Sequence, residues 1–232
     1  MISAVVFDFY GTLARQVDGP DSYMQAFAAH GYTPPSSVLD EFHTRYDGVA
    51  HVEHSVNEET YEAWVRSRLR HLAESCDVDQ RDMSSVVDAL SAADLEPMIA
   101  YPEAAATLAQ LRETGLRIGI CSNWGWDLEA FLYEVGLLDF VDSAVTSARA
   151  GARKPHPHIY TQSAQSLGTD LDEIMFVGDS WEPDVRGPRR MGMAAVHVWR
   201  MNERSDQPAP ALEPGDHRVG DLTGVLEILG LT

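Results

Sequence analysis

Five short, largely apolar segments alternate with helical stretches, and this alternation constrains the fold more than any other feature. The segments are residues 2–8, 116–121, 140–147, 173–179 and 194–199. Continuous apolar runs indicate strands buried on both faces, as in a parallel sheet. Helices are expected between or after them at 102–114, 126–136, 156–168 and 221–230. We therefore predict an α/β core with a doubly wound parallel sheet, Rossmann-like in its layers.

Residues 14–97 interrupt the alternation with helical patterns and no convincing strand. The clearest helix spans 58–75, where Tyr61, Trp64, Val65, Leu69 and Leu72 fall at helical spacing behind the capping residue Asn57. A second one places Met83, Val86, Val87 and Leu90 on one face, and weaker helices are expected at 20–30 and 36–52. We expect residues 1–13 and 98–232 to form the core and 14–97 to form an inserted, all-helical cap domain. The tract 200–219 is expected to be a surface loop.

The net charge limits the classes of partner, and the cysteine content indicates the compartment. The formal net charge of −19 disfavours nucleic acids and anionic membranes as partners, which leaves a small-molecule substrate. No apolar run approaches the roughly 20 residues of a membrane span, and the first residues lack the pattern of a secretory signal. Two distant cysteines, Cys76 and Cys121, indicate a reducing, cytoplasmic compartment. A monomer and a homodimer fit the sequence equally.

Polar residues follow four of the predicted strands. Because ligands bind beyond the carboxyl ends of parallel strands, these residues are candidates for one site. Asp8 and the residues up to Thr12 follow the first strand, and Ser122 and Asn123 follow the second. Lys154, the only lysine in the chain, comes shortly after the third. Asp179 and Asp184 follow the fourth. The sequence thus brings carboxylates, a hydroxyl, an amide and one ammonium to one edge of the sheet.

Four segments in this order resemble the motifs of the haloacid dehalogenase superfamily. They read DFYGTL (8–13), CSN (121–123), RKPHPHIY (153–160) and VGDSWEPD (177–184). The helical insertion after the first motif is similar to the small cap of one subfamily. The resemblance implies a hydrolase in which the carboxylate of Asp8 attacks the substrate and carries a covalent ester that water then hydrolyses.

The resemblance also implies roles for the neighbouring residues. Gly11 would permit the tight turn after the nucleophile, and Thr12 would orient the loop or the intermediate. Ser122 and Asn123 would hydrogen-bond the transferring group, and Lys154 would neutralise negative charge on nucleophile and substrate.

A magnesium site is implied by the same motifs. Its ligands would be the carboxylates of Asp8, Asp179 and Asp184 and the backbone carbonyl of Tyr10, since Mg²⁺ prefers such hard oxygen ligands.

Tyr10 departs from the phosphatase pattern, in which a second aspartate at this position acts as general acid and base. A tyrosine there is similar to the 2-haloacid dehalogenases, whose halide leaves without a proton. Asp179 and Asp184 favour the opposite interpretation, because uncompensated carboxylates would raise the pKa of Asp8 and weaken it as a nucleophile. The leading hypothesis is therefore a Mg²⁺-dependent phosphatase acting on a small phosphomonoester. The alternatives are a 2-haloacid dehalogenase, and a weakly active or non-catalytic protein that binds a phosphorylated ligand.

The general acid is left unassigned by the sequence. Tyr10, an acidic leaving group and a histidine of the predicted cap are the candidates, the histidines being His30, His43, His51, His54 and His71. Arg15 and Arg45 are candidates for binding an anionic substrate group. The tryptophans Trp124, Trp126 and Trp181 either line the entrance or pack in the core.

Overall fold

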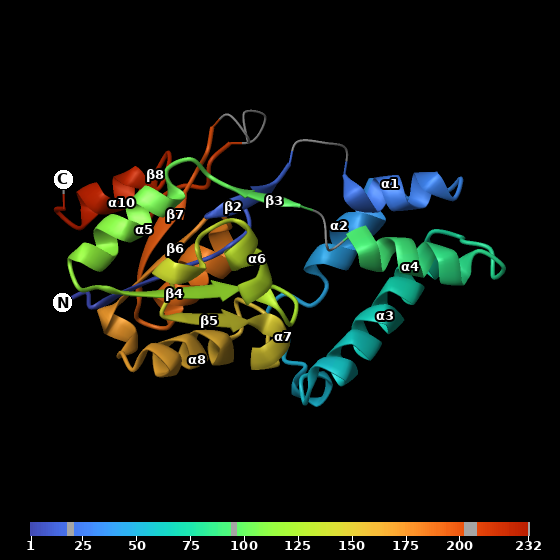
Figure 1. The fold of residues 1–232 in the computed structure, drawn as a ribbon, viewed down its shortest axis with the longest axis horizontal. Coiled ribbons are helices and arrows are strands. Elements are labelled where there is room, and N and C mark those ends of the chain that lie inside the picture. The colour runs from blue at the N-terminus through green and yellow to red at the C-terminus, as the bar shows by residue number, and fades with distance from the viewer. Residues whose placement is uncertain (18–20, 94–96, 202–207, 232) are drawn as a thin grey trace.

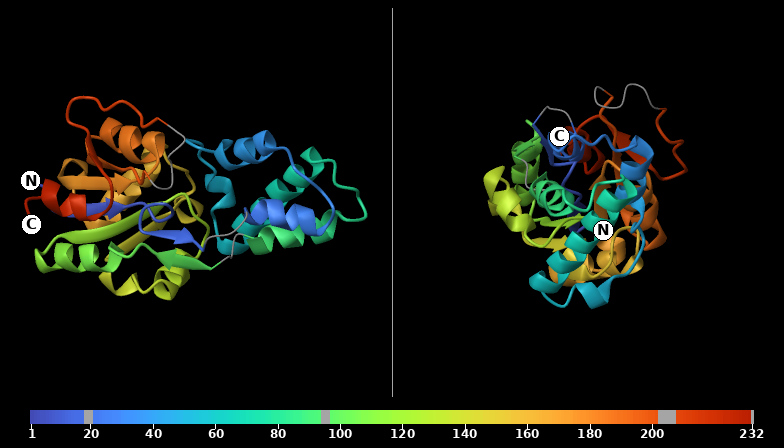
Figure 2. Two further views of the ribbon diagram at one scale, coloured as in Figure 1. Left: turned by 90° about the horizontal axis from the view of Figure 1, so that it is seen from above. Right: turned by 90° about the vertical axis from the view of Figure 1, so that its right-hand side faces the viewer.

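A computed structural model describes residues 1–17, 21–93, 97–201 and 208–231. The chain forms two lobes that lie side by side, one built on a large sheet and one made of helices (Figures 1 and 2). Both termini lie on the sheet lobe, at the end away from the helical lobe. None of the described helices has the length and apolar character needed to cross a membrane.

The sheet lobe contains a six-stranded parallel sheet in the order β5-β4-β1-β6-β7-β8. Its strands are β1 (Ala4–Phe7), β4 (Arg117–Ser122), β5 (Ser143–Thr146), β6 (Ile174–Gly178), β7 (Ala194–Val198) and β8 (His217–Val219). The first five confirm the five predicted strands. The sixth corrects the expected loop at 200–219, of which residues 202–207 lie outside the described ranges. β8 is a three-residue edge strand with an exposed histidine at its start, so it carries no apolar run.

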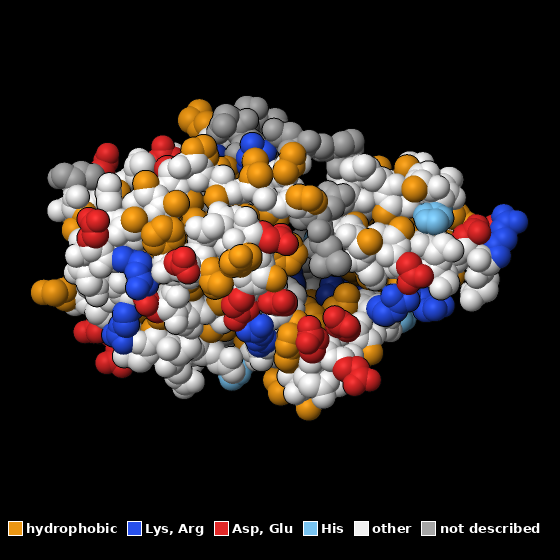
Figure 3. Space-filling view, viewed as in Figure 1, with side chains coloured by type: hydrophobic (Ala, Val, Ile, Leu, Met, Phe, Trp, Pro, Cys, Tyr) orange, Lys and Arg blue, Asp and Glu red, His pale blue; other side chains and the backbone are white. Residues whose placement is uncertain are grey.

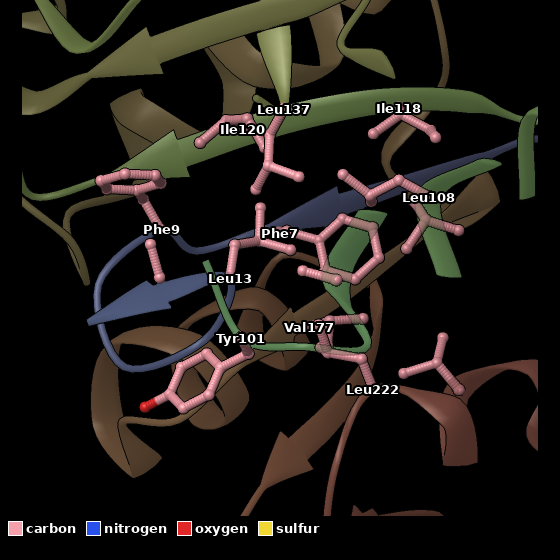
Figure 4. Close-up of a cluster of buried hydrophobic side chains, with 14 of the residues drawn as sticks. Phe7, Phe9, Leu13, Tyr101, Leu108, Ile118, Ile120, Leu137, Val177 and Leu222 are labelled. Carbon is pink, nitrogen blue, oxygen red and sulfur yellow. The ribbon is translucent and has the colours of Figure 1, made fainter. Parts of the chain in front are cut away.

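Helices cover both faces of this sheet and enclose its core. On one face lie α5 (Ala104–Glu113), α6 (Leu128–Glu134) and α10 (Thr223–Ile228), and on the other lies α8 (Pro157–Leu167). Short helical segments fill the connections: α7 (Ser147–Ala150), α9 (Gly187–Arg190), η2 (Leu138–Phe140), η3 (Leu171–Glu173) and the π-helix η4 (Trp181–Arg186). Figure 4 shows Phe7, Leu108, Val177 and Leu222 meeting in the core from four separate segments.

The helical lobe has a hydrophobic core of its own. It consists of α1 (Ser22–Ala29), α2 (Ser36–Thr44), η1 (Val52–His54), α3 (Glu58–Ser75) and α4 (Met83–Ala93). The predicted helix 58–75 is confirmed, and the Asn57 side chain accepts a hydrogen bond of 2.9 Å from the amide of Thr60. Leu69, Leu72 and the predicted face of α4 fill the core between the helices. The prediction for 36–52 is wrong beyond Thr44, because the chain turns at Gly48, whose φ is 73°.

A small antiparallel pair of strands connects the two lobes. β2 (Ala14–Gln16) pairs with β3 (Met98–Ala100), so the expectation that 14–97 contains no strand is wrong at its first three residues. A three-residue strand is too short for a periodic pattern, and its partner lies beyond all four helices in the sequence. The division into core and cap domains at these positions stays a prediction.

Candidate active site

Strand register brings the predicted catalytic residues to one edge of the sheet. Phe7, the last residue of β1, pairs with Ile120 of β4 on one side and Val177 of β6 on the other. The amide of Asp8 continues this pattern by donating to the Val177 carbonyl at 2.9 Å. Because the three strands run parallel and end at the same level, the residues that follow them lie together.

Asp8 and Lys154 form a buried ion pair at the centre of the site. The Lys154 ammonium donates to Asp8 Oδ1 at 2.7 Å and to Asp184 Oδ1 at 2.6 Å. Ser122 Oγ donates to the same Asp8 oxygen at 2.9 Å. Burial lowers the pKa of Lys154, but the carboxylates of Asp184 and Asp8 outweigh it and raise that pKa well above its usual value. Lys154 is therefore a fixed positive charge.

Asn123 holds the loop that carries Lys154. Its Nδ2 donates to the Lys154 carbonyl at 3.1 Å, and its Oδ1 accepts from the Lys154 amide at 2.7 Å. This reciprocal pair of bonds ties the end of β4 to the residue whose ammonium reaches Asp8. The predicted contact of Asn123 with the transferring group stays a prediction.

Three carboxylates converge beside this ion pair. One oxygen each of Asp8, Asp179 and Asp184 lie within 4.8 Å of one another. Burial raises the pKa of Asp184 to about 7, against the opposing effect of Lys154 and with support from the charges of Asp8 and Asp179. Three carboxylates and one ammonium leave an excess of negative charge, and a divalent cation with oxygen ligands fits such a donor set.

Two glycines make room for these carboxylates. Gly11 has a φ of 76°, and a Cβ there would come within 2.8 Å of the Asp179 carboxyl carbon. A Cβ at Gly178 would collide with the Asp184 carboxylate. Thr12 is fully buried, and its Oγ1 lacks a hydrogen-bond partner among the described residues. Both the tight turn and the close approach of Asp179 therefore explain why position 11 requires a glycine.

Tyr10 lies at the rim of the site, with 47% of its surface exposed. It borders a cavity of about 160 Å³ that Asp179 and Arg15 also line, together with Gly11, Tyr101, Val198 and Arg200. Arg45, the other arginine considered for anion binding, is exposed at the end of α2 and does not line this cavity.

Arg200, two residues after β7, is a site residue that no sequence motif indicates. One guanidinium nitrogen donates to the Thr12 carbonyl at 3.1 Å, another pairs with Glu103 at 2.7 Å, and the group lies 3.5 Å from the centre of the Tyr101 ring. It therefore fixes the loop that follows Asp8.

His197 is a second residue beside the site that no sequence motif indicates. Its Nδ1 lies 3.1 Å from Arg218 Nε, which can only donate, so Nε2 carries the proton and donates to the Asp179 carbonyl at 3.0 Å. The available signal was a lone polar residue within the apolar strand 194–199.

The aromatic candidates divide between core and lobe junction. Trp124 packs edge-on against Phe9 and Phe131 in the core, and Trp181 packs against His197. Trp126 faces Tyr61 of α3, with 6.1 Å between ring centres, and so contacts the helical lobe.

The histidines of the helical lobe also separate by position. His51 and His54 both stack on the ring of Trp64, at 4.7 and 5.0 Å between ring centres. His30, His43 and His71 are exposed. His51 is buried, and its contacts among the described residues, which include Ser55, Trp64, Tyr61 and the Gly151 carbonyl, are not with Asp8.

Known proteins are similar to this chain in sequence and in fold. Residues 2–192 match the family of haloacid dehalogenase-like hydrolases. Glyceraldehyde 3-phosphate phosphatase of Methanopyrus kandleri is 34% identical over 120 residues, which cover 49% of this chain and 51% of that protein. (S)-2-haloacid dehalogenase of Xanthobacter autotrophicus is 27% identical over 217 residues, covering 88% of this chain and 78% of that protein.

A solved structure agrees with these sequence matches. The crystal structure of a HAD phosphatase from Thermococcus onnurineus superposes with a TM-score of 0.61 at 25% identity, over 99% of this chain and 98% of that one. The match to three phosphatases, that of M. kandleri among them, spans only about half to three fifths of their own length. The family match nevertheless covers most of the present chain and includes all four motifs, so the chain belongs to the haloacid dehalogenase-like hydrolases.

Proposed function

We propose that this hydrolase is a Mg²⁺-dependent phosphatase that cleaves a small phosphomonoester through an aspartyl-phosphate on Asp8. The observation that carries the proposal is the convergence of the Asp8, Asp179 and Asp184 carboxylates, of which Asp8 and Asp184 share the single ammonium of Lys154. A dehalogenase has no need of this excess negative charge, whereas a phosphatase that binds a cation does. Similar proteins named as phosphatases support the same assignment.

The hydrogen bonds around Asp8 define what each side chain does in this reaction. Ser122 and Lys154 both bind Oδ1, which leaves Oδ2 as the oxygen that attacks phosphorus. The ammonium of Lys154 stabilises the negative charge that develops on the phosphoryl oxygens. Asp8, Asp179, Asp184 and the carbonyl of Tyr10 would hold Mg²⁺, which supplies further charge neutralisation when bound.

We also propose that the helical lobe serves as the cap of this site. Its contacts with the sheet lobe support this role: the His51 amide donates to the Gly151 carbonyl at 2.6 Å, and Tyr61 faces Trp126. Gly151 begins the loop that carries Lys154, and Trp126 follows Asn123, which binds the Lys154 backbone.

Phosphate release from an aryl phosphate, measured with Mg²⁺ and with a chelator, tests the proposed reaction. We expect turnover with Mg²⁺, its loss in chelator, and its loss in Asp8→Asn and Asp179→Asn. Asp88→Asn, which changes a surface carboxylate, is the matched control and should behave as wild type. Turnover that persists in chelator would contradict the metal dependence.

A second candidate function is 2-haloacid dehalogenation, favoured by Tyr10 and by the similarity to the X. autotrophicus dehalogenase over most of the chain. Halide release from 2-chloropropionate in the presence of chelator measures it directly. Halide release without any phosphate release would select the dehalogenase.

A further inference from the structure

Arg68, on α3 of the helical lobe, carries a charge that its surroundings do not balance. Its guanidinium lies over three aromatic rings, at 4.3 Å from the ring centre of Tyr46 and 4.9 Å from those of Trp64 and Phe42. Its Nε is buried without a hydrogen-bond partner, and its one described hydrogen bond is a long one, 3.4 Å, to the Phe42 carbonyl. Among the described residues, no carboxylate lies within ion-pairing distance of it.

Such an arrangement costs free energy in the protein without a ligand, and a bound acceptor would remove that cost. A buried donor on a charged group is expensive to leave without an acceptor. Burial accordingly lowers the pKa of Arg68, and the nearby positive charge of Arg153 lowers it further. The three rings meanwhile hold the guanidinium in place, which is the preorganisation that a binding group requires.

Arg153 brings a second guanidinium to the same place from the sheet lobe. It lies in the loop between α7 and α8, directly before Lys154, and its amide donates to the Val49 carbonyl at 3.1 Å. Its Nε lies 3.3 Å from Asp47 Oδ1. Asp47 follows Tyr46, one of the rings beneath Arg68, so the two arginines and one carboxylate form a cluster with net positive charge.

This cluster borders the catalytic residues. Asn123 Nδ2 lies 3.5 Å from Asp47 Oδ1 and 3.1 Å from the Lys154 carbonyl, and Lys154 in turn reaches Asp8. Trp64, beneath Arg68, stacks on His51, whose amide binds the Gly151 carbonyl. Figure 3 shows a hollow between the two lobes in which atoms of basic side chains are visible.

We propose that Arg68 and Arg153 bind a second anionic group of the substrate, a carboxylate or another phosphoryl group, at the junction of the two lobes. The substrate is then a small phosphomonoester with a negative charge at its other end. A planar guanidinium binds such groups through paired hydrogen bonds. In a chain of net charge −19, a doubly anionic substrate also needs a local positive site. This substrate class rests on the proposed phosphatase function.

Binding of non-hydrolysable phosphonates tests the site without turnover. Calorimetry with the Mg²⁺-loaded protein compares carboxyalkyl phosphonates of one to three methylenes with alkyl phosphonates of equal length. Propane-1,3-bisphosphonate tests a phosphoryl group as the second anion. We expect the tightest carboxyalkyl phosphonate or the bisphosphonate to bind about 10- to 100-fold more tightly than its alkyl match. The better of the two ligands identifies the second group.

Three variants decide whether the arginines cause this preference. Arg68→Met keeps the apolar stem on the rings, and Arg153→Met removes the second charge; each should reduce the preference at least about 5-fold. Arg70→Met, an exposed position on the same helix, is the charge-matched control and should retain it. Should Arg68→Met fail to fold, Arg153→Met and the wild-type comparison suffice.

Two results would overturn the anion site. One is equal affinity of wild type for carboxyalkyl, bisphosphonate and alkyl ligands, and the other is a preference that survives in both arginine variants. Failure of the phosphatase proposal has a different signature, which is no phosphate release from any phosphate ester while the anion preference in binding is retained.

Discussion

At the scale of single residues, Tyr10 stands where a general acid would be needed in the proposed phosphatase reaction. A phenol is a weak proton donor at neutral pH, because its usual pKa is about 10. Phosphate esters with poor leaving groups should therefore react slowly, and aryl phosphates with acidic leaving groups should react well.

Restoring a carboxylate at this position should change that pattern. We expect Tyr10→Asp to raise kcat on alkyl phosphates by roughly 100-fold, which is the lower range of general acid catalysis. The measurement is steady-state phosphate release from a series of alkyl and aryl phosphates. Tyr10→Asn is the control, because an asparagine has nearly the shape of an aspartate but cannot act as a general acid. Equal rates for the two variants would show that position 10 is not the source of the missing proton.

His51 makes the stability of the helical lobe depend on pH. Burial lowers the pKa of His51 to about 4, and the charges of Arg153, Arg68 and His54 act in the same direction. The unfolded chain protonates near pH 6.5, whereas the folded protein keeps this ring neutral down to about pH 4. Stability is therefore lost as the pH falls from about 6.5 towards 4.

Urea unfolding at pH 7 and pH 5 measures this effect. The free energy of unfolding of wild type should drop between these pH values by up to about 2 kcal/mol more than that of His51→Phe. The variant keeps an aromatic ring on Trp64, and the comparison cancels the other titrating groups, Asp184 included. His71→Phe, at an exposed position of α3, should follow wild type. An identical pH dependence in His51→Phe and wild type would contradict the prediction.

At the scale of elements, α3 is the helix whose sequence and structure agree most closely. Its bounds, Glu58–Ser75, are those predicted, because Asn57 caps the first turn and acidic residues follow it. Apolar residues at helical spacing then bury one face against α4. The chain signals this helix locally, so no distant contact is needed to predict it.

Removal of the cap should weaken α3 measurably. We expect Asn57→Ala to lower the free energy of unfolding by about 1 kcal/mol, since the Thr60 amide loses its acceptor. Asn57→Asp preserves the acceptor and adds a favourable charge at the helix N-terminus, so it should retain wild-type stability. Urea denaturation followed by circular dichroism compares the three proteins. Equal losses in both variants would mean that the cap bond is not the cause.

The short strands were predicted least well. β2 and β3 are neighbours in the structure but are separated in the sequence by the whole helical lobe, and β8 joins the sheet only through β7. Each has three residues, which is too few to show a period in the sequence. Their existence depends on partners that the fold brings alongside.

At the scale of the whole molecule, the proposed cation joins segments from different strands and should stabilise the fold. Asp8, Asp179 and Asp184 repel one another without a cation, and a ligand bound only by the folded state stabilises it. Mg²⁺ at 100-fold excess over its Kd should add about 2.7 kcal/mol, visible as a rise in Tm.

The variants sharpen this thermal test. Asp179→Asn should lose the Mg²⁺ response and, in chelator, be at least as stable as wild type because one repelling charge is gone. Asp88→Asn should respond to Mg²⁺ as wild type does. A wild-type Tm that does not respond to Mg²⁺ would argue against the metal site.

The sequence by itself determined the five main strands, the helices between them and the polar residues at the strand ends. These features follow from local hydrophobic patterns and from the rule that parallel strands end at one edge. The family resemblance then supplied roles for Asp8, Lys154 and Asp179.

Only the tertiary structure decided which of these residues touch and which others join them. The bridge from Lys154 to both Asp8 and Asp184, the support of Asp179 by His197, and the cage around Arg68 each depend on residues far apart in the chain. A sequence pattern carries no record of such distances, because burial and charge at these positions arise when separate elements pack together.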